Sequence, residues 1–202
     1  MKGLLIKDWK TLLKQMKVML AITALLACVP STYMSAFALF YAAMLPITAL
    51  AYDERAKWDE LAAMMPYTAK AIVGSKYVLG LTLVLQVLVL SMLSRLFVHS
   101  TPIVSEETMS LLITACLSLI LMAIDLPFMF HFGVEKGRLI YILLTCVFVV
   151  AGVNYVGKLA DAVNGIETAM VTTVPLLLLA AAVIALLLSY VISVRVYRVR
   201  RG

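Results

Sequence analysis

The sequence predicts an all-α membrane protein with about six transmembrane helices, preceded by an interfacial amphipathic helix. Hydrophobic residues make up 64% of the 202 residues and charged residues only 14%, which is too little polar surface for a soluble domain. Stretches of about 20 apolar residues, the length that crosses a bilayer core, alternate with short charged segments. Together these observations predict a single transmembrane domain over residues 1–202.

The basic residues predict which side of the membrane each loop faces. All Lys and Arg residues except Arg95 and Lys158 lie at or before the start of the first expected span, after the last, or in and next to the loops that follow the second and fourth spans. The positive-inside rule therefore places these segments and both termini in the cytoplasm, in a multi-pass protein of the cell membrane. The same rule explains the net charge of +6 without a nucleic-acid partner.

The N-terminal residues 1–16 are expected to form an interfacial helix. Apolar side chains recur on one helical face and lysines centre on the opposite face: Leu5, Trp9, Leu12 and Met16 against Lys7, Lys10, Lys14 and Lys17. We expect the apolar face to lie at the acyl boundary and the lysines to meet anionic headgroups. A cleaved signal peptide is the alternative, because a basic segment precedes an apolar run.

Six spans are expected from the apolar stretches. Pro30 and Ser31 leave the first of them short unless the long side chains of Lys14 and Lys17 reach back to the interface. The third is long enough to tilt in the bilayer. The expected spans cover residues 15–32, 33–51, 72–98, 109–132, 139–156 and 170–194.

A short cytoplasmic helix is expected over residues 53–66, between the second and third spans. The segment is too polar to enter the membrane, and Pro66 ends it. Its apolar residues keep the i, i+3, i+4, i+7 spacing of one helical face: Trp58, Leu61, Ala62 and Met65. This helix either lies on the membrane surface or docks on a partner protein.

Asp125 is the one acidic residue expected inside a span, and an intramembrane carboxylate is a candidate functional group. Pro127 disturbs the same helix, so one hypothesis is that Asp125 caps backbone amides freed at the kink. The alternatives are proton coupling and recognition of a cationic group.

Motifs for catalysis or cofactor binding are missing from the sequence. It has no Gly-rich phosphate loop, no nucleophile elbow and no HExxH zinc motif, so we expect neither an enzyme nor a cofactor in this chain. His131 and Glu135 are too few ligands for a metal site. We expect them to form an inner-loop interface with Lys136 and Arg138.

Three segments resemble the small permease subunits of ABC-2 type ATP-binding-cassette transporters. They are the opening MKGLLIKDWK, the stretch YDERAKWDELAAMMPYTAKAIVGSKY over residues 52–77, and LPFMFHFGVEKGR over residues 126–138. With the six-span layout, the resemblance covers nearly the whole chain, and the second segment is the most specific.

The resemblance implies a permease that is driven by a separate ATPase subunit, which would hold ATP and Mg. Two permeases would pair, either as copies of this chain or as sister chains, and the loop helix would serve as the coupling helix. Export of a peptide or another amphipathic cargo is implied. The residues assigned to ATPase coupling are Asp53, Glu54, Lys57, Trp58, Leu61 and Met65.

Two other functions remain open from the sequence. A non-transporting membrane protein could use the loop helix to recruit a cytoplasmic partner. A proton-coupled secondary transporter could use Asp125, and should then contain inverted repeats.

Overall fold

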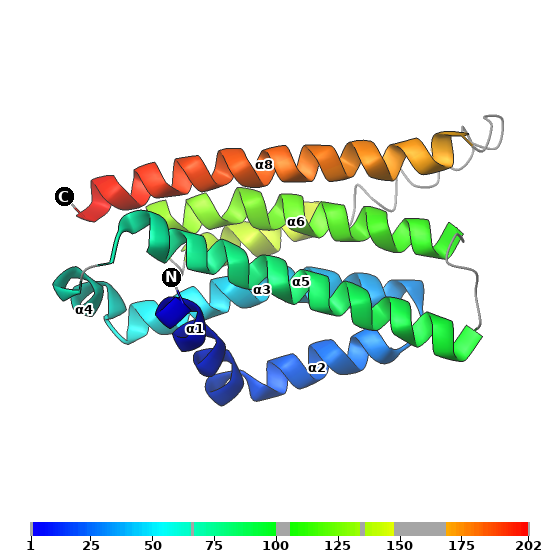
Figure 1. The fold of residues 1–202 in the computed structure, drawn as a ribbon, viewed down its shortest axis with the longest axis horizontal. Coiled ribbons are helices and arrows are strands. Elements are labelled where there is room, and N and C mark those ends of the chain that lie inside the picture. Colours follow the sequence, from blue (N-terminus) through cyan, green and yellow to red (C-terminus); the bar gives the residue numbers. More distant parts are fainter. Residues whose placement is uncertain (1, 66, 100–105, 134–135, 148–168, 202) are drawn as a thin grey trace.

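The computed structural model describes residues 2–65, 67–99, 106–133, 136–147 and 169–201, and the regular structure of these residues is entirely helical (Figure 1). The all-α prediction is thus confirmed for the described part of the chain. A further helix covers residues 136–147. The labelled helices are α1 (Lys2–Gln15), α2 (Lys17–Cys28), α3 (Thr32–Arg55), α4 (Trp58–Met64), α5 (Ala69–His99), α6 (Glu106–Phe132) and α8 (Ala169–Arg201).

Four of the described helices, α3, α5, α6 and α8, are long and apolar enough to cross a membrane. α1 and α2 form a pair bent by 82°, which counts as a fifth candidate span if taken together. The span expected over residues 139–156 is helical as far as residue 147, and its remainder lies outside the described residues. The protein is therefore a membrane protein whose described residues hold four or five candidate spans, and the expected count of six stays a prediction, because part of the span expected over residues 139–156 lies outside them.

α3 is the central helix of the bundle and α8 lies at its edge. Of the most apolar stretch of each helix, 56% is buried in α3 but only 22% in α8. Ala38, Ala42 and Ala43 of α3 are completely buried, and small residues such as these let neighbouring helices approach closely. α3 accordingly contacts α2, α5 and α6, while α8 packs mainly on α6.

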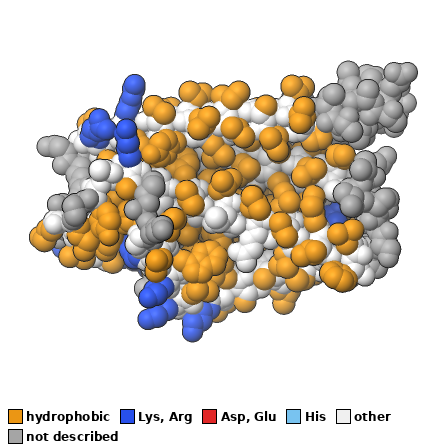
Figure 2. Space-filling model, in the orientation of Figure 1, with side chains coloured by type: hydrophobic (Ala, Val, Ile, Leu, Met, Phe, Trp, Pro, Cys, Tyr) orange, Lys and Arg blue, Asp and Glu red, His pale blue; other side chains and the backbone are white. Residues whose placement is uncertain are grey.

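The surface of the bundle carries a broad apolar belt (Figure 2). Large apolar side chains such as Phe37, Leu85 and Leu187 are more than half exposed. Lys and Arg side chains gather mainly at the end of the molecule where α1, α4 and the C-terminus lie (Figures 1 and 2). An apolar belt with one basic end is the surface expected of a protein in a bilayer.

Hydroxyl groups join α5, α6 and α8 near Pro127. Because proline has no N–H, it leaves the carbonyl of Ala123 without its helical donor. The Ser189 hydroxyl of α8 donates a hydrogen bond to this carbonyl. The Tyr77 hydroxyl of α5 lies 2.5 Å from the Ser189 hydroxyl and 2.8 Å from that of Ser193. A group freed by proline in one helix is thus satisfied by its neighbour.

Candidate functional site

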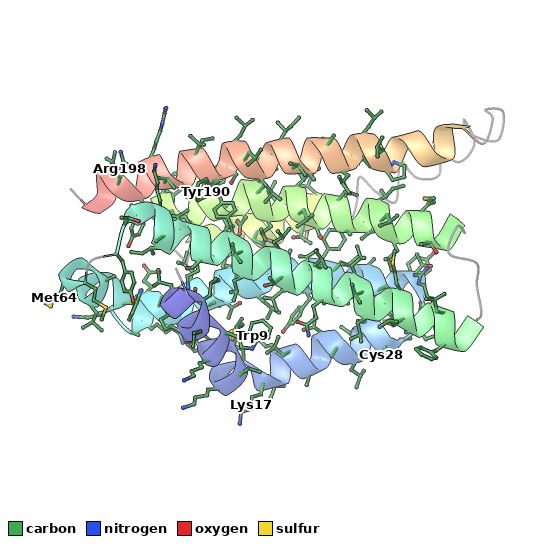
Figure 3. The ribbon with its side chains drawn as sticks, in the orientation of Figure 1. Trp9, Lys17, Cys28, Met64, Tyr190 and Arg198 are labelled. Carbon is green, nitrogen blue, oxygen red and sulfur yellow. The ribbon has the colours of Figure 1, made fainter. Side chains whose placement is uncertain are left out.

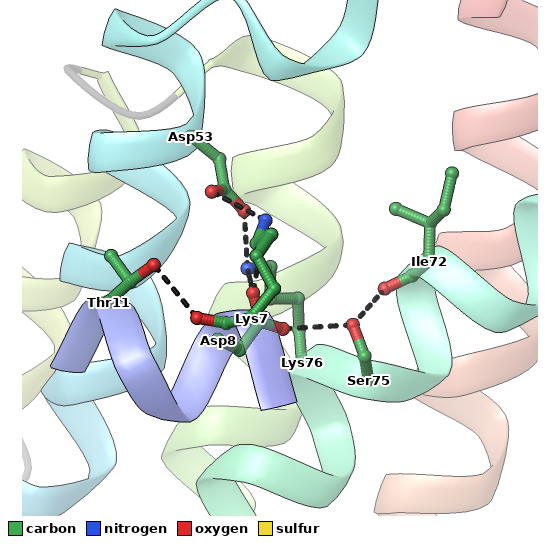
Figure 4. A network of polar contacts seen from close by, with 7 residues as sticks. All are labelled: Lys7, Asp8, Thr11, Asp53, Ile72, Ser75 and Lys76. Carbon is green, nitrogen blue, oxygen red and sulfur yellow. Dashed lines mark hydrogen bonds and ion pairs between the residues drawn. The ribbon is translucent and has the colours of Figure 1, made fainter. Parts of the chain in front are cut away.

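Four charged side chains meet at the basic end of the bundle and are called here the ion cluster: Lys7, Asp8, Asp53 and Lys76 (Figure 4). The Lys76 ammonium lies 2.8 Å from Asp8 and 2.5 Å from Asp53. The Lys7 ammonium lies 2.8 Å from Asp53 and 3.1 Å from Asp8. The two positive and two negative charges balance.

The ion cluster is buried most deeply at Lys76 and Asp8, whose side chains are only 2% and 1% exposed. The hydroxyl of Ser75 donates a further hydrogen bond to Asp8 at 3.1 Å. Buried charges are tolerated only when they are paired and hydrogen-bonded, and removing one partner leaves the other uncompensated. The ion cluster therefore holds α1, α3 and α5 in one arrangement at this end of the bundle.

The position of Asp8 follows from which face of α1 is buried. Leu4, Asp8, Leu12 and Met16 recur every four residues and are all 2% exposed or less. Leu12 and Met16 belong to a buried cluster with residues of α3 and α5. The expectation that Leu12 and Met16 lie against lipid was therefore wrong, because the bundle itself covers them, whereas Trp9 of the same expected face is 40% exposed.

The helix expected over residues 53–66 is divided in the structure. α3 continues to Arg55, so Asp53 and Glu54 belong to its last turn. Lys57 then adopts the left-handed backbone conformation, with φ of 48°, which non-glycine residues rarely adopt. This break redirects the chain, and α4 begins only at Trp58.

The structure divides the apolar face expected for α4, because Trp58 and Ala62 lie against the core while Leu61 and Met65 are exposed. Trp58 is partly buried against the core, and the Lys7 ammonium lies 4.0 Å from the centre of its ring, a cation–π contact. Leu61, Met64 and Met65 are 49%, 85% and 40% exposed, and are called here the outer face of α4. The ion cluster thus contacts the inner side of α4 through Trp58, while the outer face remains available.

Asp125 lies in α6 and is fully buried. Within the described residues, neither of its carboxylate oxygens has a hydrogen-bond partner. The hypothesis that it caps amides at Pro127 was wrong, because proline frees a carbonyl rather than an amide, and Ser189 already donates to that carbonyl.

Replacing Asp125 with leucine is expected to stabilise the protein by about 1–3 kcal/mol, because it removes a buried polar group that no described donor satisfies. Asp8→Leu is the matched control, since Asp8 is equally buried but fully paired, and it should destabilise the protein. Unfolding temperatures of the purified variants in detergent measure both effects. Equal destabilisation by the two substitutions would show that the Asp125 carboxylate is stabilised as well as that of Asp8.

The inner-loop interface expected around His131 stays a prediction. His131 and Lys136 are exposed, Arg138 is partly buried, and Glu135 lies outside the described residues. Over the described ranges, no group of three or more His, Cys, Asp or Glu side chains could hold a metal ion.

Sequence reasoning missed Asp8 and Lys76 as site residues. Asp8 did carry a signal, because it is the only acidic residue before Asp53 and stands four residues from both Leu4 and Leu12. An acidic residue in an apolar row of a basic helix indicates a buried partner. Lys76 stands within the span expected over residues 72–98, and this position was its only local signal of burial.

Comparison with known proteins gives one match. A family model described as an ABC-2 family transporter protein matches residues 3–198. This range includes the ion cluster, α4 and Asp125. No curated protein and no solved structure matches the chain.

Proposed function

Given that the chain belongs to the ABC-2 family of transporter membrane proteins and is the permease subunit of an ABC transporter, we propose that it exports a peptide or another amphipathic cargo. A separate ATPase subunit binds ATP and Mg and supplies the energy. Spans with few polar groups support this class of cargo, because a polar solute would need convergent hydrogen-bonding groups along its path. A second permease, identical or related, completes the pathway.

We place the basic end of the bundle in the cytoplasm. α1, α4 and the C-terminus lie at this end (Figure 1), where Lys and Arg side chains gather (Figure 2). Positively charged segments are retained on the cytoplasmic side of a membrane. This orientation presents α4 to a cytoplasmic ATPase.

The observation that carries the proposal is the outer face of α4. Met64 is 85% exposed, and Leu61 and Met65 flank it. Glu54 and Lys57 are exposed nearby. A small apolar centre with charged residues around it is the usual anatomy of a protein interface. α4 therefore serves as the coupling helix, with Met64 and Leu61 as its anchors instead of the expected Trp58.

The ion cluster links α4 to the membrane-spanning helices through direct side-chain contacts. Only Ala56 and Lys57 separate α4 from α3, and Trp58 packs under Lys7. Lys7 is in turn paired with Asp53 of α3. Because buried ion pairs resist separation, a displacement of α4 moves α1 and the adjoining ends of α3 and α5 together. The ATPase thus drives a rigid group of helices.

Purification of the tagged chain in mild detergent tests this proposal. A soluble ATPase with vanadate-sensitive activity should co-purify with the unaltered protein. With the double variant Leu61→Asp/Met64→Glu, the amount of co-purified ATPase should fall at least about tenfold, because interface anchors are each worth about 2 kcal/mol or more. Insertion of the variant in the membrane should be unchanged.

Val199→Glu provides the matched control, because Val199 is also strongly exposed, at 82%, but lies near the end of α8. It should retain the ATPase. Equal recovery of ATPase with the α4 variant would exclude α4 as the docking site. Recovery of a partner without ATP hydrolysis would instead favour a protein that recruits a partner without transporting cargo.

A further inference from the structure

α1 crosses the end of the bundle instead of running along it. The bend between α1 and α2 is 82°, and α2 runs beside the long helices (Figure 1). If the long helices cross the bilayer, α1 lies in the plane of its surface. One face of α1 is then covered by the bundle, and the other faces lipid and headgroups.

The uncovered face of α1 combines apolar and basic side chains. Ile6, Trp9 and Leu13 are 57%, 40% and 48% exposed. Lys10 and Lys14 are also exposed, and Lys17, at the bend, points away from the bundle (Figure 3). These six residues, the last of which begins α2, are called here the outer face of α1.

The charge on this face is uncompensated within the described part of the chain. Asp8, the only acidic residue of α1, points inward to Lys7 and Lys76. Lys10, Lys14 and Lys17 form no ion pair with any described residue, in contrast to Lys7. The outer face therefore offers three positive charges beside an exposed indole ring.

We propose that the outer face of α1 binds anionic phospholipid of the cytoplasmic leaflet. Tryptophan favours the level of the headgroups, and the apolar side chains reach the acyl boundary. Lysine stems extend along apolar surface while their ammonium groups reach anionic headgroups. A soluble anionic partner would leave Ile6 and Leu13 in water, so the membrane surface is the occupant that satisfies both kinds of side chain.

This binding places lipid on one side of α1 and the ion cluster on the other. Asp8 joins the inner side of α1 to Lys76 of α5, and Lys7 joins it to Trp58 of α4. Bound lipid thus stabilises the position of the helix that holds α4. This consequence rests on the proposed coupling role, but the binding itself does not.

Tryptophan fluorescence tests the binding directly. The chain has only two tryptophans, so the Trp58→Phe variant reports from Trp9 alone. We would reconstitute it in bilayers that contain brominated phosphatidylglycerol or brominated phosphatidylcholine. Trp9 should be quenched by both lipids, with an apparent affinity for the anionic lipid at low salt that is higher by at least about fivefold, the effect of a single lysine near an anionic surface. The preference should fall as salt is raised.

Two further variants in the Trp58→Phe background separate charge from insertion. In the variant Lys10→Gln/Lys14→Gln/Lys17→Gln, the ratio of the apparent affinities for anionic and neutral lipid should fall close to one. The neutral lipid should still quench Trp9. Arg195→Gln/Arg198→Gln changes charge at the same end of the bundle on α8 and should keep the preference. No quenching by either lipid, or equal affinity for both in the Trp58→Phe protein, would overturn the proposal. Both results are independent of ATPase binding.

Discussion

Replacing Lys76 with methionine is expected to lower the free energy of unfolding by about 3–5 kcal/mol, the usual cost of breaking a buried ion pair. Methionine keeps the length of the side chain but removes the ammonium that lies 2.8 Å from Asp8 and 2.5 Å from Asp53. Lys7 alone would then face two carboxylates, one of them 1% exposed. The change should appear as a large fall in the yield and unfolding temperature of the purified protein.

Restoring the charge balance should recover part of this loss. In the double variant Asp8→Asn/Lys76→Met, Lys7 and Asp53 remain as a neutral pair, and the coupling between the two substitutions should reach about 0.5–3 kcal/mol. Lys70→Met is the control on the same helix, since the Lys70 side chain is exposed. A Lys76→Met protein as stable as Lys70→Met would show that the ion cluster does not hold the helices together.

Gly80→Leu is expected to destabilise the protein by about 3 kcal/mol, at the upper end of the range for overpacking. A Cβ atom at Gly80 of α5 would lie 2.3 Å from the sulfur of Met122 in α6 and 2.8 Å from the ring of Pro46 in α3. Three helices therefore meet where only glycine fits. Unfolding temperatures in detergent, compared with those of the unaltered protein, measure the cost.

Two variants define the cause of this effect. Met122→Ala should relieve part of the cost of Gly80→Leu, because the flexible methionine is one of the two obstacles and the Pro46 ring is the other. Gly3→Ala should be neutral or slightly stabilising, since its Cβ would lie an ordinary 3.5 Å from the Tyr67 hydroxyl and alanine favours helix. An equal loss of stability from the substitutions at Gly80 and Gly3 would exclude the close approach of Met122 and Pro46 to Gly80 as the cause.

The long helices and the basic end were predictable from the sequence. Runs of apolar residues indicate helices α3, α5, α6 and α8 because a lipid environment demands internally satisfied backbone groups. The resemblance carried by residues 52–77 also named the family that the family model confirms. The short helix before Pro66 was expected, but its start was not, because the turn at Lys57 depends on a backbone conformation that residue types rarely reveal.

The partners of buried charges were not predictable. Asp8 and Lys76 are 68 positions apart, and neither residue type indicates burial by itself. The periodicity of α1 allowed several apolar faces, and the inner one was chosen by packing against α3 and α5. For the same reason Trp58, an expected anchor, packs against the core, whereas Met64 is strongly exposed.

The sequence by itself determined the membrane class of this protein, its long helices and its family, because these follow from hydropathy, charge distribution and local motifs. Only the tertiary structure decided which faces of α1 and α4 are buried, which charges form the ion cluster, and that Ser189 satisfies the carbonyl freed by Pro127. These features depend on contacts between residues distant in the chain. Burial of a charge is stable only where such a contact supplies its partner.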